Sequence, residues 1–262
     1  MQTMNRFPPL EEKTIAIVGA GGRIGREITT AVLAAGAQVV AIDCNDEALS
    51  SLSNLSGGDA GRLLPIKADI TNVASIEQML SLANDRFGVV NGAVNAAYPR
   101  NSNYGRPFFE VEFADFSENL SLHLGGYFLF MQQCAKYAVS ARSNFSLVNL
   151  SSIYGVMTPR FEVYEKTSFT MPVEYAAIKS AIIHLTKYAS AYAGEYFRAN
   201  CVSPGGILAG QDDSFLQRYN SHCMRKGMLS PDDVTGSVVF LLSDLSEFVV
   251  GQNIVVDDGF SL

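Results

Sequence analysis

The stretch TIAIVGAGGRIG, residues 14 to 25, decides how the chain folds. Its first five residues are apolar and rich in β-branched side chains, which is typical of a buried strand. The glycine-rich segment GAGGRIG ends that strand, and REITTAVLAAGA after it has the composition of a helix. A strand, a glycine turn and a helix in this order predict a site where backbone N–H groups and a helix N-terminus hold phosphate.

A second apolar run, QVVAID, follows this helix and ends in Asp43, 18 positions after Gly25. An acidic side chain at the end of the second strand can accept hydrogen bonds from both hydroxyls of an adenosine ribose. A glycine turn alone is a weak signal, but the full order of strand, turn, helix, strand and acid predicts a dinucleotide-binding unit.

The rest of the chain continues the alternation of strands and helices. Further strands are expected at 62–70, 89–97, 144–152, 197–203 and 252–258, and helices at 73–88, 110–141, 173–197 and 231–244. Such alternation predicts an α/β fold, a Rossmann-like doubly wound parallel sheet with helices on both faces. We expect residues 1–262 to form one domain, with 1–13 as an N-terminal extension.

Composition narrows the class of protein. The chain has 262 residues, 48% of them hydrophobic, with a net charge of -7. Without a Lys/Arg cluster, nucleic acid and anionic membranes are not expected as partners, and a small molecule fits better. Four scattered cysteines indicate neither a disulfide framework nor a metal site. With no apolar signal region at the N-terminus and no run of ~18 apolar residues, a cytoplasmic location is expected.

The sequence YAAIK, residues 175–179, lies in an expected helix, where a spacing of four puts Tyr175 and Lys179 on one face. A phenol has a pKa of about 10, and a nearby ammonium favours the phenolate and lowers that pKa. The pair could therefore transfer a proton at neutral pH. The alternative is a chance occurrence on an amphipathic helix.

Seven motifs in this order resemble the single-domain short-chain dehydrogenases/reductases, from Thr14 to Leu262. They are GAGGRIG, ADIT, NAA, LSS, YAAIK, SPGG and GQNIVVDDG. The resemblance implies an NAD(P)-dependent oxidoreductase that transfers hydride between nicotinamide and a hydroxyl or carbonyl group. It also implies a homodimer or homotetramer.

The resemblance assigns roles to individual residues. Tyr175 matches the acid/base, Lys179 the residue that holds the nicotinamide ribose, and Ser152 the one that binds the substrate oxygen, although Ser152 could also be a strand-end cap. The residues matching cofactor contacts are Gly19, Gly21, Gly22, Arg23, Ile24, Gly25, Asp43, Asp69, Ile70, Asn95, Ala96, Ala97, Tyr175, Lys179, Pro204, Gly205 and Ile207. Asp69 could instead be a simple turn residue. Asp43 favours NAD over NADP because it repels a 2′-phosphate, and Arg23 acts in the opposite direction.

The chain departs from the family pattern at several positions. Val18 and Arg23 replace a threonine and a glycine around the glycine turn, and Tyr98 replaces a glycine after Asn95. Ala209 stands where a threonine often lies. His123 aligns with the fourth catalytic residue, an asparagine; it is expected either to continue a hydrogen-bond relay behind Lys179 or to be a packed core histidine.

Two polar segments point to the substrate. They are an unusually long insertion at 153–174 and the loop at 98–109, and both are rich in hydrogen-bonding groups. Burying such groups against an apolar substrate would leave them unpaired, so a polyol, a sugar or a phosphorylated sugar is expected. The runs around the insertion and the ending VDDGFSL are similar to bacterial oxidoreductases of flagellin modification. The alternative is that these segments are solvated or lie between subunits.

The segment 206–229 is predicted to be a lid with a short helix capped by Asp212 or Asp213. Phe215, Leu216 and Tyr219 would pack on the cofactor, and Arg160, Arg218 and Arg225 would be available for an anion. The alternative is a rigid segment held in a subunit interface. Two other functions stay open: a dinucleotide sensor without turnover, and a sugar epimerase or dehydratase, although such relatives usually carry a further C-terminal domain.

Overall fold

The computed structural model describes residues 9–52, 60–167 and 170–262, and these form a seven-stranded parallel sheet in the order β3-β2-β1-β4-β5-β6-β7. The strands are β1 Thr14–Val18, β2 Gln38–Asp43, β3 Leu63–Lys67, β4 Gly92–Asn95, β5 Phe145–Leu150, β6 Phe197–Pro204 and β7 Asn253–Val256. The order runs outward from β1 in both directions, so the predicted doubly wound α/β fold is confirmed.

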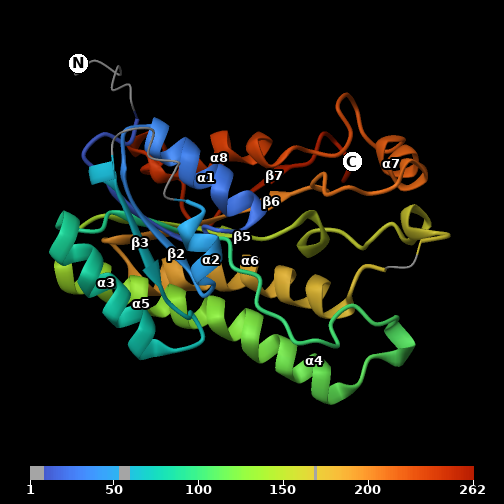
Figure 1. Ribbon diagram of the computed structural model, residues 1–262, viewed down its shortest axis with the longest axis horizontal. Helices are drawn as coiled ribbons and strands as arrows, with labels where there is room; N and C mark the ends of the chain where they lie inside the picture. Colours follow the sequence, from blue (N-terminus) through green and yellow to red (C-terminus); the bar gives the residue numbers. More distant parts are fainter. Residues whose placement is uncertain (1–8, 53–59, 168–169) are drawn as a thin grey trace.

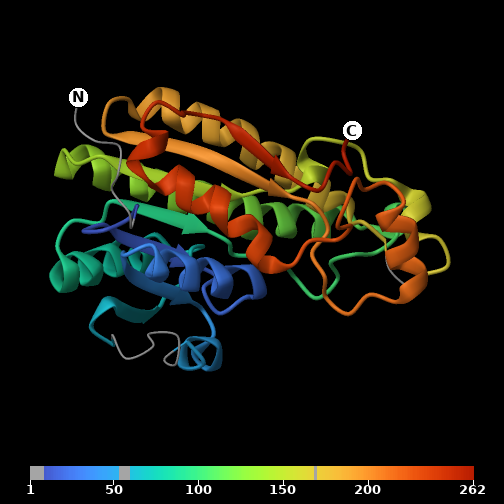
Figure 2. The same ribbon diagram turned by 90° about the horizontal axis from the view of Figure 1, so that it is seen from above.

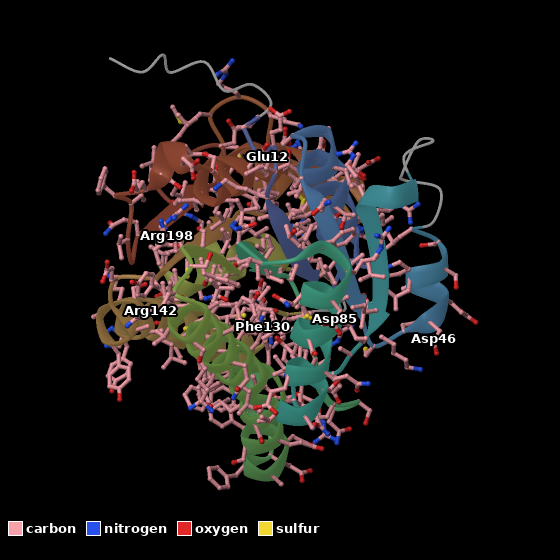
Figure 3. The ribbon with its side chains drawn as sticks, turned by 90° about the vertical axis from the view of Figure 1, so that its left-hand side faces the viewer. Glu12, Asp46, Asp85, Phe130, Arg142 and Arg198 are labelled. Atoms are coloured by element: carbon pink, nitrogen blue, oxygen red, sulfur yellow. The ribbon has the colours of Figure 1, made fainter. Side chains whose placement is uncertain are left out.

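Helices cover both faces of the sheet (Figure 1). One face carries α1 (Arg23–Ala34) and α8 (Thr235–Leu242), and the other carries α3 (Val73–Phe87), α5 (Gly125–Ala141) and α6 (Val173–Ala193). Each layer encloses its own apolar core, because both faces of a parallel sheet are buried. In Figure 3 Phe130 of α5 lies within one of these cores, and its side chain is fully buried.

The carboxyl ends of the strands point toward the side of the molecule that holds α7 (Asp213–Asn220) and the C-terminus (Figure 2). Strand order reverses between β1 and β4, and this is the point where open α/β sheets bind ligands. None of the helices in the described part of the chain is long and apolar enough to span a membrane.

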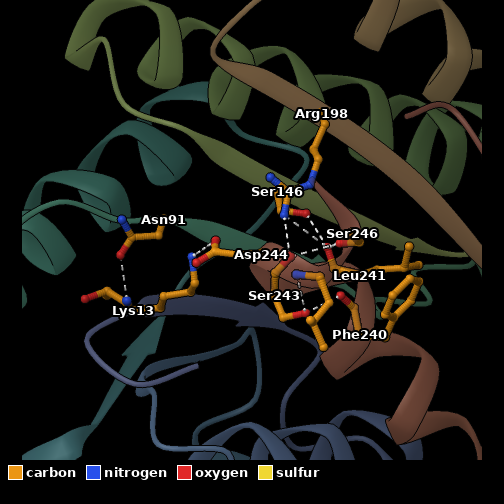
Figure 4. Close-up of polar contacts among 11 residues, drawn as sticks. Lys13, Asn91, Ser146, Arg198, Phe240, Leu241, Ser243, Asp244 and Ser246 are labelled. Atoms are coloured by element: carbon orange, nitrogen blue, oxygen red, sulfur yellow. Dashed lines mark hydrogen bonds and ion pairs between the residues drawn. The ribbon is translucent and has the colours of Figure 1, made fainter. Parts of the chain in front are cut away.

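At the other end of the strands, where β5 and β6 begin, polar contacts join the sheet to the end of α8 and the segment after it (Figure 4). The hydroxyl groups of Ser146 and Ser246 both donate to the carbonyl oxygen of Leu241, at 2.7 and 2.9 Å, and the Arg198 guanidinium donates to the carbonyl of Ser243 at 3.0 Å. These bonds satisfy carbonyl groups at the end of α8. The polar contacts at the amino-terminal ends of these strands therefore have a structural role.

The expected helix at 110–141 is interrupted. It consists of α4 (Phe113–Asn119), a π-helical turn at Leu120–Leu124 and α5. A π turn contains one residue more than an α turn, and amino-acid composition does not reveal this extra residue. Such turns often occur at functional sites. The predicted strand at 62–70 is also shorter than expected, because β3 ends two residues before Asp69.

The remaining boundaries follow from local chemistry. The helix expected at 173–197 ends at Ala193, because Gly194 has a φ of 73°. A short helix α2 (Asp46–Ser50) begins after Asn45, whose side chain caps it. Most of the proposed N-terminal extension, residues 1–8, lies outside the described residues.

Candidate active site

A cavity of about 740 Å³ opens at the carboxyl ends of the strands. It brings together a large share of the predicted site residues. Those that line it are Gly22, Arg23, Ile24, Gly25, Ala96, Ala97, Ser152, Tyr175, Lys179, Pro204, Gly205 and Ile207. Segments that are distant in the sequence thus meet around one space.

The glycine turn is shaped by close backbone packing. A Cβ atom on Gly25 would lie 2.0 Å from the carbonyl oxygen of Gly19, and one on Gly21 would lie 2.3 Å from the Cβ of Ala48. Gly19 also has a φ of 74°, which disfavours a side chain. Helix α1 begins after Gly22, which has no side chain to cap the first N–H groups of the helix. The first turn of this helix lines the cavity, so these N–H groups are available to an anion such as phosphate.

Asp43 lies at the carboxyl end of β2, outside the cavity lining, and its side chain contacts the glycine turn. Its carboxylate accepts hydrogen bonds from the backbone N–H groups of Gly21 at 3.0 Å and Asn45 at 3.1 Å. A carboxylate has about four acceptor positions, so two more partners can still be bound. Gly21, Gly22 and Asp43 therefore fit the phosphate and ribose of a dinucleotide.

The catalytic candidates come from two neighbouring elements, β5 and α6. The Lys179 ammonium donates a hydrogen bond to the carbonyl of Leu150 at 2.8 Å, and the Ser151 hydroxyl donates to the carbonyl of Lys179, also at 2.8 Å. The Ser152 hydroxyl accepts from the N–H of Tyr154 at 3.2 Å, so this residue is a cap as well as part of the cavity wall. These bonds fix Lys179 and Ser152 beside Tyr175.

Burial controls the pKa values of this pair. Burial raises the pKa of Tyr175 above its ordinary range, while the hydrogen bond with the Ser152 side chain acts in the opposite direction. Burial also lowers the pKa of Lys179 to about 7. The Lys179 ammonium lies 5.5 Å from the centre of the Tyr175 ring, and the lowering of the phenol pKa by its charge stays a prediction.

Tyr98 lies at the centre of the site. Its ring packs edge-on against Tyr175 at a centroid distance of 5.7 Å, and against His123 at 5.1 Å. The guanidinium carbon of Arg100 lies 4.7 Å from the centre of the same ring. Where the family pattern has a glycine, this chain thus has an aromatic ring that contacts the acid/base candidate.

His123 lies in the π turn and is fully buried behind Tyr98, outside the cavity lining. Within the described chain, neither ring nitrogen has a hydrogen-bond partner. Burial, together with the charges of Lys179 and Arg100, lowers the imidazole pKa to about 2. The ring is therefore neutral and keeps one donor and one acceptor available, which suits a relay, while its burial also suits packing.

Several predicted cofactor contacts lie away from the cavity. The Asp69 carboxylate accepts from the N–H and the hydroxyl of Thr71, both at 2.8 Å, which supports the turn reading. The side chain of Ile70 is buried and contacts Gly126. Asn95 is buried at the end of β4, and its side-chain oxygen accepts from the N–H of Ala97 at 3.2 Å.

The proposed lid packs against the insertion. Asp212 caps α7, and Phe215 of that helix contacts Tyr164 of the insertion at a ring distance of 5.5 Å. Tyr219 stacks on Phe260 at 4.2 Å, and its hydroxyl accepts from the N–H of Gly206 at 2.6 Å. Phe215 and Tyr219 also line the cavity, and the closing of this segment as a lid stays a prediction.

Two of the arginines expected to bind an anion have structural partners instead. Arg160 donates to the carbonyl groups of Phe260 and Leu262, and Arg218 donates to that of Val163 at 3.0 Å. Neither lines the cavity, and Arg225 lies at a separate shallow pocket. Residues 168–169 of the insertion lie outside the described residues.

The loop at 98–109 is fastened to α4. The side chains of Asn101 and Asn103 both donate to Asp115 at 3.0 Å, and Arg106 pairs with the same carboxylate at 3.2 Å. Asp115 is almost fully buried, so these polar groups hold the loop in place. The polar side chains of this loop expected to reach the substrate are Arg100, Asn101, Asn103, Tyr104 and Arg106, and of these Arg100 lines the cavity.

Sequence reasoning missed part of the cavity wall. The wall includes Tyr127, Leu150 and Ser151, which the sequence analysis did not assign to the site. Within the predicted insertion and lid it includes residues that were not named individually: Tyr154, Thr170, Met171, Pro172, Gln211 and Met228. Tyr154 could have been found from its place two residues after Ser152. The others depend on how the insertion and α7 pack, which no local pattern encodes.

Comparison with known proteins agrees with this architecture. A family model described as "Enoyl-(Acyl carrier protein) reductase" matches residues 19–261. Post-translational flagellin modification protein A of Campylobacter coli is 38% identical over 256 residues, covering 97% of this chain and 100% of that protein. A 2,5-dichloro-2,5-cyclohexadiene-1,4-diol dehydrogenase of Sphingobium indicum is 31% identical, covering 96% of this chain and 98% of that protein.

Solved structures show the same similarity. A short-chain dehydrogenase from Leptospira borgpetersenii, crystallised with bound NAD+, superposes with a TM-score of 0.86 at 32% identity, covering 100% of this chain and 98% of that one. The ordered motifs, the sheet order and these matches over nearly the whole length lead to one conclusion. The chain belongs to the short-chain dehydrogenase/reductase family.

Proposed function

We propose that the protein is an NAD-dependent dehydrogenase or reductase that acts on a hydroxyl or carbonyl group of a sugar derivative. The convergence of Ser152, Tyr175 and Lys179 on one wall of the cavity carries this proposal. Membership in an oxidoreductase family and a relative with bound NAD+ support the reaction class and the cofactor. The similarity to a flagellin modification protein supports a substrate from bacterial glycan biosynthesis.

Each group has a defined task in this proposal. Ser152 donates a hydrogen bond to the substrate oxygen and orients it toward Tyr175. The Tyr175 hydroxyl gives a proton to that oxygen in reduction and takes it back in oxidation. Lys179, held by the Leu150 carbonyl, provides positive charge and ribose contact next to the phenol. NAD supplies or accepts the hydride when it is bound.

NAD is preferred over NADP in this proposal. The Asp43 carboxylate lies at the end of β2, next to the glycine turn, where a 2′-phosphate would meet a like charge. Arg23 lines the cavity near the other end of the turn and does not form an ion pair with Asp43 among the described residues. Tighter binding of NADPH than of NADH would contradict this assignment.

Exposed aromatic residues support an oligomer. Tyr188 and Tyr192 of α6 stack on each other at 6.1 Å, and Tyr192 is 83% exposed. Large exposed apolar side chains often mark association surfaces. A homodimer or homotetramer stays a prediction, which light scattering would test. The cytoplasmic location, the single domain and the closing lid also stay predictions.

The decisive experiment compares the wild type with Tyr175→Phe in the presence of NAD and a panel of sugars, sugar phosphates and nucleotide sugars. Removing the hydroxyl should lower kcat by ~10²-fold or more, since a positioned acid/base group contributes at least this much. The affinity for NAD should stay within about threefold, because the ring remains. A variant with more than about a tenth of wild-type kcat would contradict the role of Tyr175.

A protein that binds NAD but oxidises or reduces no member of the panel would favour the sensor function. Release of an epimer or a dehydrated sugar without net change in nicotinamide absorbance would favour an epimerase or dehydratase. For the epimerase or dehydratase outcome, the Tyr175→Phe variant distinguishes the protein's own activity from a contaminant, because a contaminant would be unaffected.

A further inference from the structure

The charge of the cavity differs from that of the whole protein. The chain carries a net charge of -7, yet the described residues around the cavity include Arg23, Arg100 and Lys179 and no aspartate or glutamate. A concave site lined by one sign of charge attracts ligands of the opposite sign. Under the proposed function, Arg23 and Lys179 lie against the cofactor, which leaves Arg100 for the substrate.

Arg100 is positioned but not neutralised. Its guanidinium stacks on the Tyr98 ring and donates one hydrogen bond, to the Tyr98 carbonyl at 3.3 Å. A guanidinium has five N–H donors, and Arg100 forms no ion pair within the described residues. Stacking on the ring restricts the side chain without occupying the donors.

The surroundings of Arg100 connect it to the reacting group. The guanidinium carbon of Arg100 lies 4.7 Å from the centre of the Tyr98 ring, and the centre of the Tyr175 ring lies 5.7 Å from that same point. The guanidinium carbon is therefore no more than about 10 Å from the centre of the Tyr175 ring, a distance that a sugar ring with one phosphate can span. An anion bound there and the reacting carbon would belong to the same small substrate.

Three other arginines, from the two substrate segments and from the predicted lid, already have partners. Arg106 pairs with Glu112 and Asp115, while Arg160 and Arg218 donate to backbone carbonyls. Each of them holds a loop in place and lies outside the cavity lining. Arg100 therefore differs from its neighbours in both partner and position.

We propose that Arg100 binds an oxyanion on the sugar substrate, a phosphate ester or a carboxylate, and so selects acidic sugars over neutral ones. This inference rests on the proposed function and names its substrate class. A planar guanidinium forms two parallel hydrogen bonds with either oxyanion, which fixes the orientation of the sugar as well as its affinity. The two sources of the anion share this chemistry, and the probes below distinguish them.

Calorimetric titration of the protein with saturating NAD tests the inference without turnover. The probes are N-acetylglucosamine 1-phosphate, UDP-N-acetylglucosamine, glucuronic acid and neutral N-acetylglucosamine. At least one acidic probe should bind more tightly than the neutral sugar. Arg100→Met, which keeps the apolar stem, should weaken that binding by about 10- to 100-fold, in line with loss of a charge-assisted hydrogen bond. Arg100→Lys should retain part of it.

Arg225→Met is the control, because it removes the same charge from an exposed side chain at a position outside the cavity. It should leave the affinity for the acidic probe within about twofold. Two results would overturn the inference: the neutral sugar binding as tightly as every acidic probe, or Arg100→Met binding the best acidic probe like the wild type. In either case NAD binding and the Tyr175→Phe effect would leave the proposed function standing, whereas loss of NAD binding in the wild type would refute that function itself.

Discussion

The two walls of the cavity are built in different ways. The wall formed by β1 and α1 consists of backbone, where Gly19, Gly21 and Gly25 allow contacts too close for any Cβ atom. The opposite wall consists of large side chains from the insertion and α7, such as Tyr154, Phe215 and Tyr219, and Phe260 of the C-terminal tail packs in the same cluster. The backbone wall tolerates almost no sequence change, whereas the aromatic wall can be remodelled one side chain at a time, so it is suited to adapt to different substrates.

Gly25→Ala should have the largest effect, because the new Cβ would lie 2.0 Å from the Gly19 carbonyl oxygen and force the turn apart. We expect the affinity for NAD to fall more than ~100-fold, as the phosphate-binding N–H groups move. Equilibrium titration with NADH measures this. Gly236→Ala in α8 is the control: its Cβ would meet nothing within 4 Å, and stability should rise by up to about 1 kcal/mol. Unchanged NADH binding by Gly25→Ala would show that the backbone wall is less rigid than described.

Phe260→Ala tests the aromatic wall. The ring is fully buried, stacks on Tyr219 at 4.2 Å and lies under Arg160 at 5.6 Å. Its removal should lower the free energy of unfolding by about 3 kcal/mol and speed proteolysis near Arg225, while NAD binding changes little. Phe248→Ala is the control, since that ring is 90% exposed. If Phe260→Ala lowered the affinity for NAD as much as Gly25→Ala does, the two walls would be structurally coupled.

Lys179→Met tests the residue where the two walls meet. Burial lowers the lysine pKa to about 7 from an ordinary value of 10.5. Protonated Lys179 is therefore less favourable in the folded protein than in the unfolded chain, and this lowers the free energy of unfolding. This cost is full below pH 7 and disappears as the pH rises toward 10.5. The variant should therefore be inactive but more stable, by on the order of 2 kcal/mol at pH 6.

Chemical denaturation of the Lys179→Met variant and the wild type at pH 6, 8 and 10 measures this difference, which should shrink steadily with pH. Lys187→Met, on the exposed side of the same helix, should show no such trend. A constant difference across the three pH values would show that burial does not perturb Lys179.

His123 is expected to give the smallest effect. Replacement by Asn, which also donates and accepts, should keep kcat within about threefold, whereas Leu should lower it about tenfold by removing the relay group. Steady-state kinetics at two pH values would check this, because a neutral imidazole with a pKa near 2 adds no pH dependence of its own. Equal activity of both variants would support the packing interpretation.

The contrast between the walls also explains what could be predicted from the sequence. The turn at 19–25, Asp43 and the pair Tyr175 and Lys179 could be placed, because backbone sterics and helical spacing restrict which residues occur there. The fate of Arg160 and Arg218 could not be, since their carbonyl partners come from Phe260, Leu262 and Val163, in other segments of the chain.

The π turn at Leu120–Leu124 shows a second limit. Apolar residues recur on both sides of it and no proline interrupts them, so the segment reads as one helix at 110–141 despite Gly125 and Gly126. The extra residue is accommodated by packing against α6, and it rotates His123 relative to a continuous helix. A prediction from helical periodicity assumes regular α turns. The sequence could therefore align His123 with a family position, but it could not place the His123 ring behind Tyr98.

The ring of phenols around the cavity has an optical consequence. The chain contains no tryptophan, and six of its eleven tyrosines line the cavity in the described structure: Tyr98, Tyr127, Tyr154, Tyr164, Tyr175 and Tyr219. Ultraviolet emission from this protein therefore originates to a large extent at the site itself, without a background of indole light. Quenching of that emission by an absorbing ligand would report occupancy and closure of the cavity in real time, with no label attached.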